Sequence, residues 1–177
     1  MYYARKLSKN TTIEKLKAKN IDEIHLIEAD ILKQELSTTG NTLSFWRVEC
    51  LEEKDDALKA ILLSTTSIIK TQFILVKKEI FDKYGLKFND NKGQTGYKGF
   101  DVLHSDMINL NYMKIELVLK AFKEAIEDEK AIPKYEKGKV KELIKEVVES
   151  NLLDEEQLNE NLKDSIEDML EKCKKTK

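Results

Sequence analysis

The chain has 177 residues, which suits one compact domain with a small appendage. Its 31 basic and 33 acidic residues nearly cancel, so no overall charge is available to hold a polyanion or an anionic membrane. The apolar runs are too short to span a bilayer, and the N-terminus lacks the apolar core of a signal peptide. The two cysteines, Cys50 and Cys173, fit neither a disulfide framework nor a metal motif. We expect a cytoplasmic protein of bacterial or phage origin, with no cofactor and no metal.

The N-terminal residues 1–20 are locally basic. They predict a short strand over 2–7 and a short basic helix after Thr12. Four of the bases form a candidate nucleic-acid-binding set: Arg5, Lys6, Lys9 and Lys15. The sequence pI of about 5.9 argues against a dedicated nucleic-acid-binding domain, so a solvated basic face is the favoured interpretation.

The middle of the chain predicts a strand, a helix and a second strand. Residues 41–50 alternate in a pattern that suits a strand covered on both faces, and Trp46 is expected to be buried there. An amphipathic helix follows Leu51, and residues 71–78 form the second strand. The length of this segment fits a crossover unit with two parallel strands.

The second half of the chain predicts mainly helices. A short helix ends at Gly85, and a polar loop covers residues 87–99. The next helix has this apolar stripe: Tyr112, Ile115, Val118, Leu119, Phe122 and Ile126. Pro133 marks a change in composition, beyond which residues 139–172 contain no aromatic residue and read as short helices.

The expected fold class is α+β, or α/β, with a small sheet of three or four strands covered by helices and a helical C-terminal extension. We expect a core domain over residues 1–132 and the extension over 133–177. A fragment that ends at Pro133 is then expected to stay folded, since it contains its own strands and apolar stripes.

The segment DVLHSDMIN offers the strongest candidate for catalysis. On a strand, His104 and Asp106 would share a face; on a helix, Asp101 and His104 would. Either pair supplies two metal ligands, fewer than a hydrolytic site needs. A structural role is favoured for all three residues, and Asp106, Asn109 and Asn111 compete to cap the following helix.

The segment GQTGYKG spaces three glycines at intervals of three, but it matches neither the P-loop nor the dinucleotide-binding pattern. A surface loop is the favoured interpretation, and a lid over a ligand is the alternative. Tyr97 and Phe100 are candidate partner-binding residues, because exposed aromatic side chains often contact partner proteins.

Three functions remain open from the sequence. The first is a non-enzymatic protein that binds another protein, such as a regulatory subunit of a bacterial or phage defence complex or an immunity or antitoxin-like protein. The second is a metal-dependent hydrolase or nuclease that uses Asp101, His104 and Asp106. The third is a weak nucleic-acid-binding module at the basic N-terminus. The scarcity of His and Cys and the segregated charges favour the first function over an enzyme.

Overall fold

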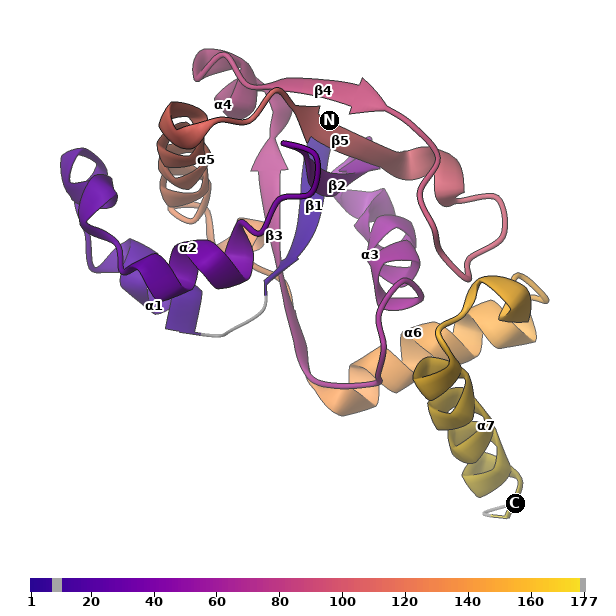
Figure 1. The fold of residues 1–177 in the computed structure, drawn as a ribbon. Helices are drawn as coiled ribbons and strands as arrows, with labels where there is room; N and C mark the ends of the chain where they lie inside the picture. Colours follow the sequence, from indigo (N-terminus) through magenta and orange to yellow (C-terminus); the bar gives the residue numbers. More distant parts are fainter. Residues whose placement is uncertain (8–10, 176–177) are drawn as a thin grey trace.

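A computed structural model describes residues 1–7 and 11–175 of the chain. One sheet contains six strands in the spatial order β4-β5-β2-β1-β3-β6, and each neighbouring pair is antiparallel (Figure 1). The strands are β1 (Tyr2–Leu7), β2 (Leu43–Val48), β3 (Thr71–Lys77), β4 (Lys87–Asp90), β5 (His104–Ile108) and β6 (Lys134–Tyr135). The protein is therefore α+β; the predicted sheet of three or four strands is too small, and the α/β alternative is wrong.

Helices cover both faces of the sheet, so the fold has three layers (Figure 1). The first face carries α1 (Thr11–Lys17), the 3-10 helix η1 (Ile21–Leu26), α2 (Ala29–Glu35), α4 (Lys78–Lys83) and α5 (Tyr112–Ala125). The second face carries α3 (Lys54–Leu62), α6 (Lys137–Glu149) and α7 (Glu160–Lys175). Four further 3-10 helices are η2 (Leu51–Glu53), η3 (Asp101–Leu103), η4 (Glu129–Ala131) and η5 (Glu155–Gln157). None of the helices in the described part of the chain is long and apolar enough to cross a membrane.

Alternation along the central strands supplies both cores. In β1, Tyr3 packs in the core of the first face and Ala4 in that of the second. In β3, Val76 lies in the core of the first face and Leu75 in that of the second. Because both faces are covered, this strand is a continuous apolar run. Trp46 lies in β2 with 6% of its surface exposed, so its predicted burial in a sheet is confirmed.

The predicted crossover unit needs a correction. β2 and β3 both pair with β1 in antiparallel fashion, so they run in the same direction, but β1 lies between them. The α3 connection therefore skips one strand position. The N-terminal strand β1 occupies the position between β2 and β3. The local pattern of residues 43–77 contains no information on where β1 pairs.

The sequence patterns predicted neither β4 nor β6, and for β5 they left a strand and a helix open. Residues 87–90, expected in a loop, form the edge strand β4, whose side chains are mostly polar and exposed. β5 interrupts the region expected to lead into a helix, and β6 has two residues. Strands this short or this polar acquire their pairing from the neighbouring strand, so their own sequences carry a weak signal.

The residues after Pro133 continue the same sheet and core. The backbone N–H of Phe73 donates to the Pro133 carbonyl at 3.0 Å, and β6 extends this pairing along β3. On the second face, Val140 and Leu143 of α6 are buried in one cluster with Leu58 of α3. Residues 133–177 thus contain the strand β6 as well as α6 and α7, and they share their core with the rest of the chain.

Candidate functional site

β5 brings His104 and Asp106 to one face of the sheet. The half-buried His104, Asp106 and Ile108 alternate with the buried Ser105 and Met107, which is the pattern of a strand with one more deeply covered face. Pairing with β2 sets Asp106 opposite Ser44 and His104 opposite Trp46. The strand alternative for this segment is therefore the one that the structure adopts.

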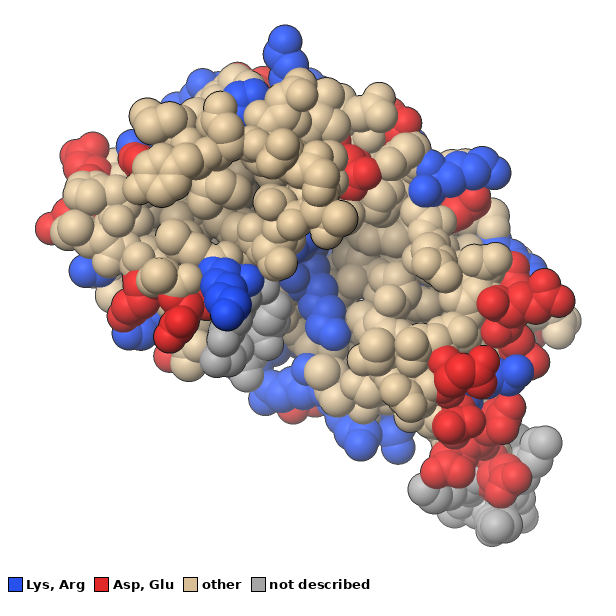
Figure 2. All heavy atoms as spheres, in the orientation of Figure 1, with Lys and Arg blue, Asp and Glu red and all other residues tan. Residues whose placement is uncertain are grey.

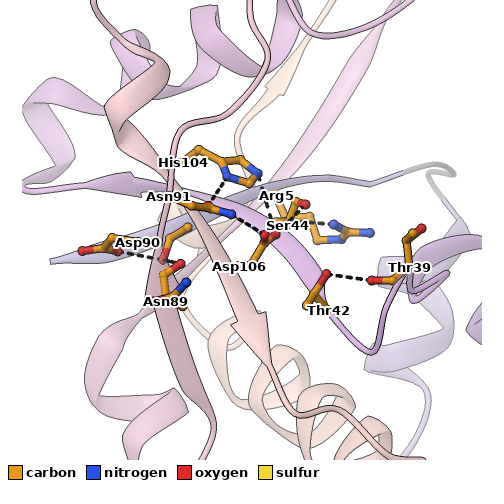
Figure 3. A network of polar contacts seen from close by, with 10 residues as sticks. Arg5, Thr39, Thr42, Ser44, Asn89, Asp90, Asn91, His104 and Asp106 are labelled. Atoms are coloured by element: carbon orange, nitrogen blue, oxygen red, sulfur yellow. Dashed lines mark hydrogen bonds and ion pairs between the residues drawn. The ribbon is translucent and has the colours of Figure 1, made fainter.

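Asp106 is the centre of a hydrogen-bond network on this face (Figure 3). Its two carboxylate oxygens accept from the Ser44 hydroxyl at 2.8 Å and from the Asn91 side-chain amide at 2.7 Å. Nε2 of His104 lies 3.8 Å from the nearer carboxylate oxygen, Oδ1. Asn91 also holds the other ring nitrogen, with 2.6 Å between its Oδ1 and Nδ1 of His104.

These contacts assign the histidine tautomer. Asn91 donates its amide nitrogen to Asp106, so its carbonyl oxygen must accept from Nδ1 of His104. Nδ1 therefore carries a proton, and in the neutral ring Nε2 is the unprotonated nitrogen on the side of Asp106. Burial lowers the pKa of His104, and the negative charge of Asp106 offsets part of that effect.

The order of the contacts does not match a Ser–His–Asp triad. In such a triad the histidine lies between the serine and the aspartate and accepts the serine proton. Here Ser44 donates directly to Asp106, and His104 makes its short contact with Asn91. The hydroxyl therefore lacks a histidine base, and the network satisfies polar groups at a half-buried position.

Asp101, the third predicted member, lies apart from the other two in its contacts. It belongs to η3, forms an ion pair with Lys92 at 3.2 Å and accepts the Gly93 backbone N–H through its carbonyl. Among residues 1–7 and 11–175, no cluster of three or more His, Cys, Asp or Glu is placed to hold a metal ion. The structure thus joins His104 to Asp106 but does not assemble the metal site of the hydrolase hypothesis.

Asp106 does not cap α5; Asn111 does. Asp106 lies within β5, and the side chain of Asn111 accepts from the Lys114 backbone N–H at 3.0 Å to cap α5. The first residue of the predicted stripe, Tyr112, points outward and is 91% exposed.

The glycine loop has a structural explanation. A Cβ on Gly93 would lie 2.6 Å from the His104 side chain, and a Cβ on Gly96 would lie 2.3 Å from that of Leu158. The Gly96 N–H donates to the Leu63 carbonyl, and its own carbonyl accepts from the Asp154 N–H. Two of the glycines therefore permit close packing, by which the loop joins the sheet, α3 and the segment before α7.

The two aromatic residues of this loop lie against the core. Tyr97 is 4% exposed, stacks on Phe100 with 3.9 Å between ring centroids, and donates its hydroxyl to Asp56 at 3.0 Å. Burial, together with Asp56, raises the pKa of Tyr97. Tyr97 thus stabilises the loop, and a contact of either ring with a partner stays a prediction.

The predicted nucleic-acid-binding residues do not share one surface. Arg5 directs its guanidinium to the backbone carbonyls of Ser44 and Glu35, and Lys15 forms an ion pair with Glu28. Lys6 lies on the opposite face of β1 from Arg5. Lys9 lies outside the described residues.

Sequence reasoning missed Ser44 and Asn91, which complete the network. Asn91 follows the edge strand β4, and Ser44 lies in β2 on the other side of β5. Their approach depends on the pairing of three strands. Only a correct strand order could have identified them.

Neutral His104 makes the stability of the fold depend on pH. Since its pKa is lowered in the folded state, the unfolded chain takes up the proton first as the pH falls. The stability is therefore complete above about pH 6.5, the ordinary histidine value, and is lost as the pH drops toward the lower folded value.

We expect His104→Gln to reduce this loss, measured as urea-unfolding free energies on both sides of that range. His25→Gln, at an exposed position in η1, is the matched histidine control. Equal pH dependence in wild type and His104→Gln would contradict the assignment.

The network as a whole consists of satisfied hydrogen bonds between β2, β4 and β5, with a serine that lacks an activating base. Comparison of the chain with protein-family models, with curated proteins and with solved structures gives no match. The interpretation of the site therefore rests on its own geometry, which favours a structural role for His104 and Asp106.

Proposed function

We propose that this chain is a non-catalytic binding protein that holds another protein through an apolar patch at the start of α5. The patch consists of Leu26, Tyr112 and Met113. Their exposed fractions are 56%, 91% and 67%, respectively. The exposure of Tyr112 is the observation that carries the proposal, because a tyrosine this open gains nothing from the fold of its own chain.

The three patch residues come from two elements that pack together. η1 contacts α5, and Asp22 and His25 of η1 lie near enough to act electrostatically on Lys120 and Glu116 of α5, respectively, which form an ion pair with each other at 2.7 Å. The two segments therefore run in opposite directions, which brings Leu26, the last residue of η1, toward the first turn of α5. We propose that the three side chains act as one apolar surface.

The side-chain types suit a protein partner. Tyrosine and methionine are enriched in the centres of protein interfaces, and methionine adapts its shape to irregular surfaces. A tyrosine anchor that becomes buried in a partner pocket is typical of the few residues that dominate an interface. A regulatory role in a bacterial or phage system is a further part of this proposal.

The experiment uses proximity labelling in cells that produce the protein, followed by affinity measurements with the purified partner. Tyr112→Ser combined with Met113→Ser is expected to lose the partner and to weaken binding at least tenfold, or about 1.4 kcal/mol. Ile69→Ser combined with Val102→Ser is the matched control, since those side chains are 46% and 49% exposed elsewhere. A partner retained equally by both double variants would refute the patch.

A further inference from the structure

Lysine side chains gather at one end of the sheet, where β1 ends and β3 begins. Lys6 lies opposite Phe73, whose N–H bonds to Pro133, and Gln72 lies opposite Lys134. The set is Lys6, Lys70, Lys134, Lys137, Lys139 and Lys141. Residues far apart in the sequence thus form a basic surface around this end of the sheet, with Lys6 on the side of the second face and Lys134 on the side of the first. The local charge of residues 1–20 did not predict it.

Acidic side chains compensate this set only in part. Glu136 pairs with Lys70 at 2.5 Å, and Glu142 pairs with Lys139 at 3.3 Å. Asp168 lines a small cavity of about 150 Å³ together with Lys137 and Lys141. Six lysines against these three acids leave a local excess of three positive charges.

Figure 2 shows the same separation across one face of the molecule. Lys and Arg side chains occupy the central hollow and the edge below it, whereas Asp and Glu gather over α7. The acids of α7 are Glu160, Asp164, Glu167, Asp168 and Glu171. The field of the molecule is therefore asymmetric although its net charge is close to zero.

Lys6 and Lys141 are the half-buried members of the set, and Lys6 lies in the sheet itself. Burial lowers the pKa of Lys6, with no carboxylate contributing among the described residues. An enclosed cation without an opposing charge is unfavourable in the free protein. An anion bound at this end of the sheet would relieve that cost.

We propose that this basic surface binds the phosphate backbone of a nucleic-acid duplex, independently of its sequence. The lysines supply point charges, which suit phosphate oxygens better than base edges. Tyr135, the aromatic residue next to Lys134, directs its hydroxyl to Asp55 at 2.9 Å and packs on Phe73, so it offers no platform for an unpaired base. This activity is independent of the protein-binding patch on α5.

The test measures binding of the full chain to a fluorescein-labelled DNA duplex by anisotropy at increasing potassium chloride. Each lysine–phosphate contact adds about −0.9 to the slope of log affinity against log salt. Lys134→Gln, Lys137→Gln and Lys141→Gln together are expected to weaken binding at least tenfold at about 50 mM salt and to flatten the slope by about 2.7. Lys6→Gln alone is expected to flatten it by about 0.9.

The matched control removes three lysines outside the set: Lys98→Gln, Lys114→Gln and Lys163→Gln. It changes the net charge equally and is expected to stay within about twofold of the wild type. Thermal melts confirm that each variant is folded. Absence of binding at about 50 mM salt, equal loss in both triple variants, or equal competition by polyglutamate would each overturn the proposal.

Discussion

A chain that ends at Pro133 is expected to lose its fixed tertiary structure. The deletion removes β6, α6 and α7, and with them these buried side chains of the second-face core: Val140, Leu143, Ile144, Val147, Leu158, Leu162, Ile166 and Met169. Each fully buried apolar side chain stabilises a fold by roughly 1.5–3 kcal/mol. For eight side chains this amounts to roughly 12–24 kcal/mol, which matches or exceeds the roughly 5–15 kcal/mol by which a typical domain is stable.

The deletion also exposes the surfaces that these residues covered. Leu58 and Ile61 of α3 lose their α6 neighbours, and Phe73 loses the ring of Tyr135 at 5.9 Å between centroids. The glycine loop loses its backbone bonds to Leu152 and Asp154. The composition change at Pro133 favours the opposite outcome, a folded fragment, so this experiment separates the two interpretations.

The measurement is near-UV circular dichroism together with a urea titration followed by the fluorescence of Trp46. The fragment is expected to show a flat near-UV spectrum and a broad transition. A chain that ends at Glu171 keeps the buried residues of α7 and provides the control. A sharp, native-like transition in the shorter fragment would show that residues 1–133 form an independent domain.

Arg5→Met is expected to lower the free energy of unfolding by about 3 kcal/mol. The guanidinium donates to the Ser44 carbonyl at 2.7 Å and to the Glu35 carbonyl at 2.9 Å. It also lies over the ring of Phe45, 5.7 Å from the centroid. One side chain on β1 thus fixes β2 and the C-terminal end of α2, where a positive charge interacts favourably with the helix dipole.

The surroundings of Arg5 explain why its loss is costly. Burial lowers the pKa of Arg5 to about 10, and the neighbouring charge of Glu35 offsets part of that effect. Glu35 is 1% exposed and accepts the Thr12 hydroxyl at 2.6 Å, which connects α1 to the same cluster. Without Arg5, a buried carboxylate remains beside carbonyls that have lost their charged donors.

Urea unfolding of Arg5→Met, Arg5→Lys and Lys15→Met provides the comparison. Arg5→Lys keeps the charge but loses the forked geometry, so it is expected to fall between wild type and Arg5→Met. Lys15→Met breaks an exposed ion pair with Glu28 and is expected to cost less than about 1 kcal/mol. Equal destabilisation by Arg5→Met and Lys15→Met would contradict the anchoring role.

The candidate site shows where sequence reasoning stops. The alternation of HSDMI places His104 and Asp106 on one face of a strand, and this alternative was open from the sequence. Their partners Ser44 and Asn91 come from β2 and from the end of β4, and only the order β4-β5-β2 brings them within hydrogen-bond distance. Asp101, close in sequence, pairs with Lys92 instead.

The sequence by itself determined the features that depend on neighbouring residues along the chain. Apolar alternation predicted β2 and the burial of Trp46, and continuous apolar residues predicted β3. Periodicity at helical spacing predicted α3 and most of α5. These patterns show which side of a helix or strand faces the core, and that side is set by the spacing of apolar residues along the chain.

The tertiary structure alone decided the features that depend on pairing between distant segments. The polar strands β4 and β5 and the two-residue β6 form because neighbouring strands supply their hydrogen bonds. That pairing inserts β1 between β2 and β3, directs Arg5 toward the Ser44 carbonyl and brings Lys6 and Lys134 to the same end of the sheet. The outward direction of Tyr112 depends on how α5 packs on the sheet. The pairing of strands is determined by the burial and hydrogen bonding of the whole sheet, so the sequence of one segment cannot predict it.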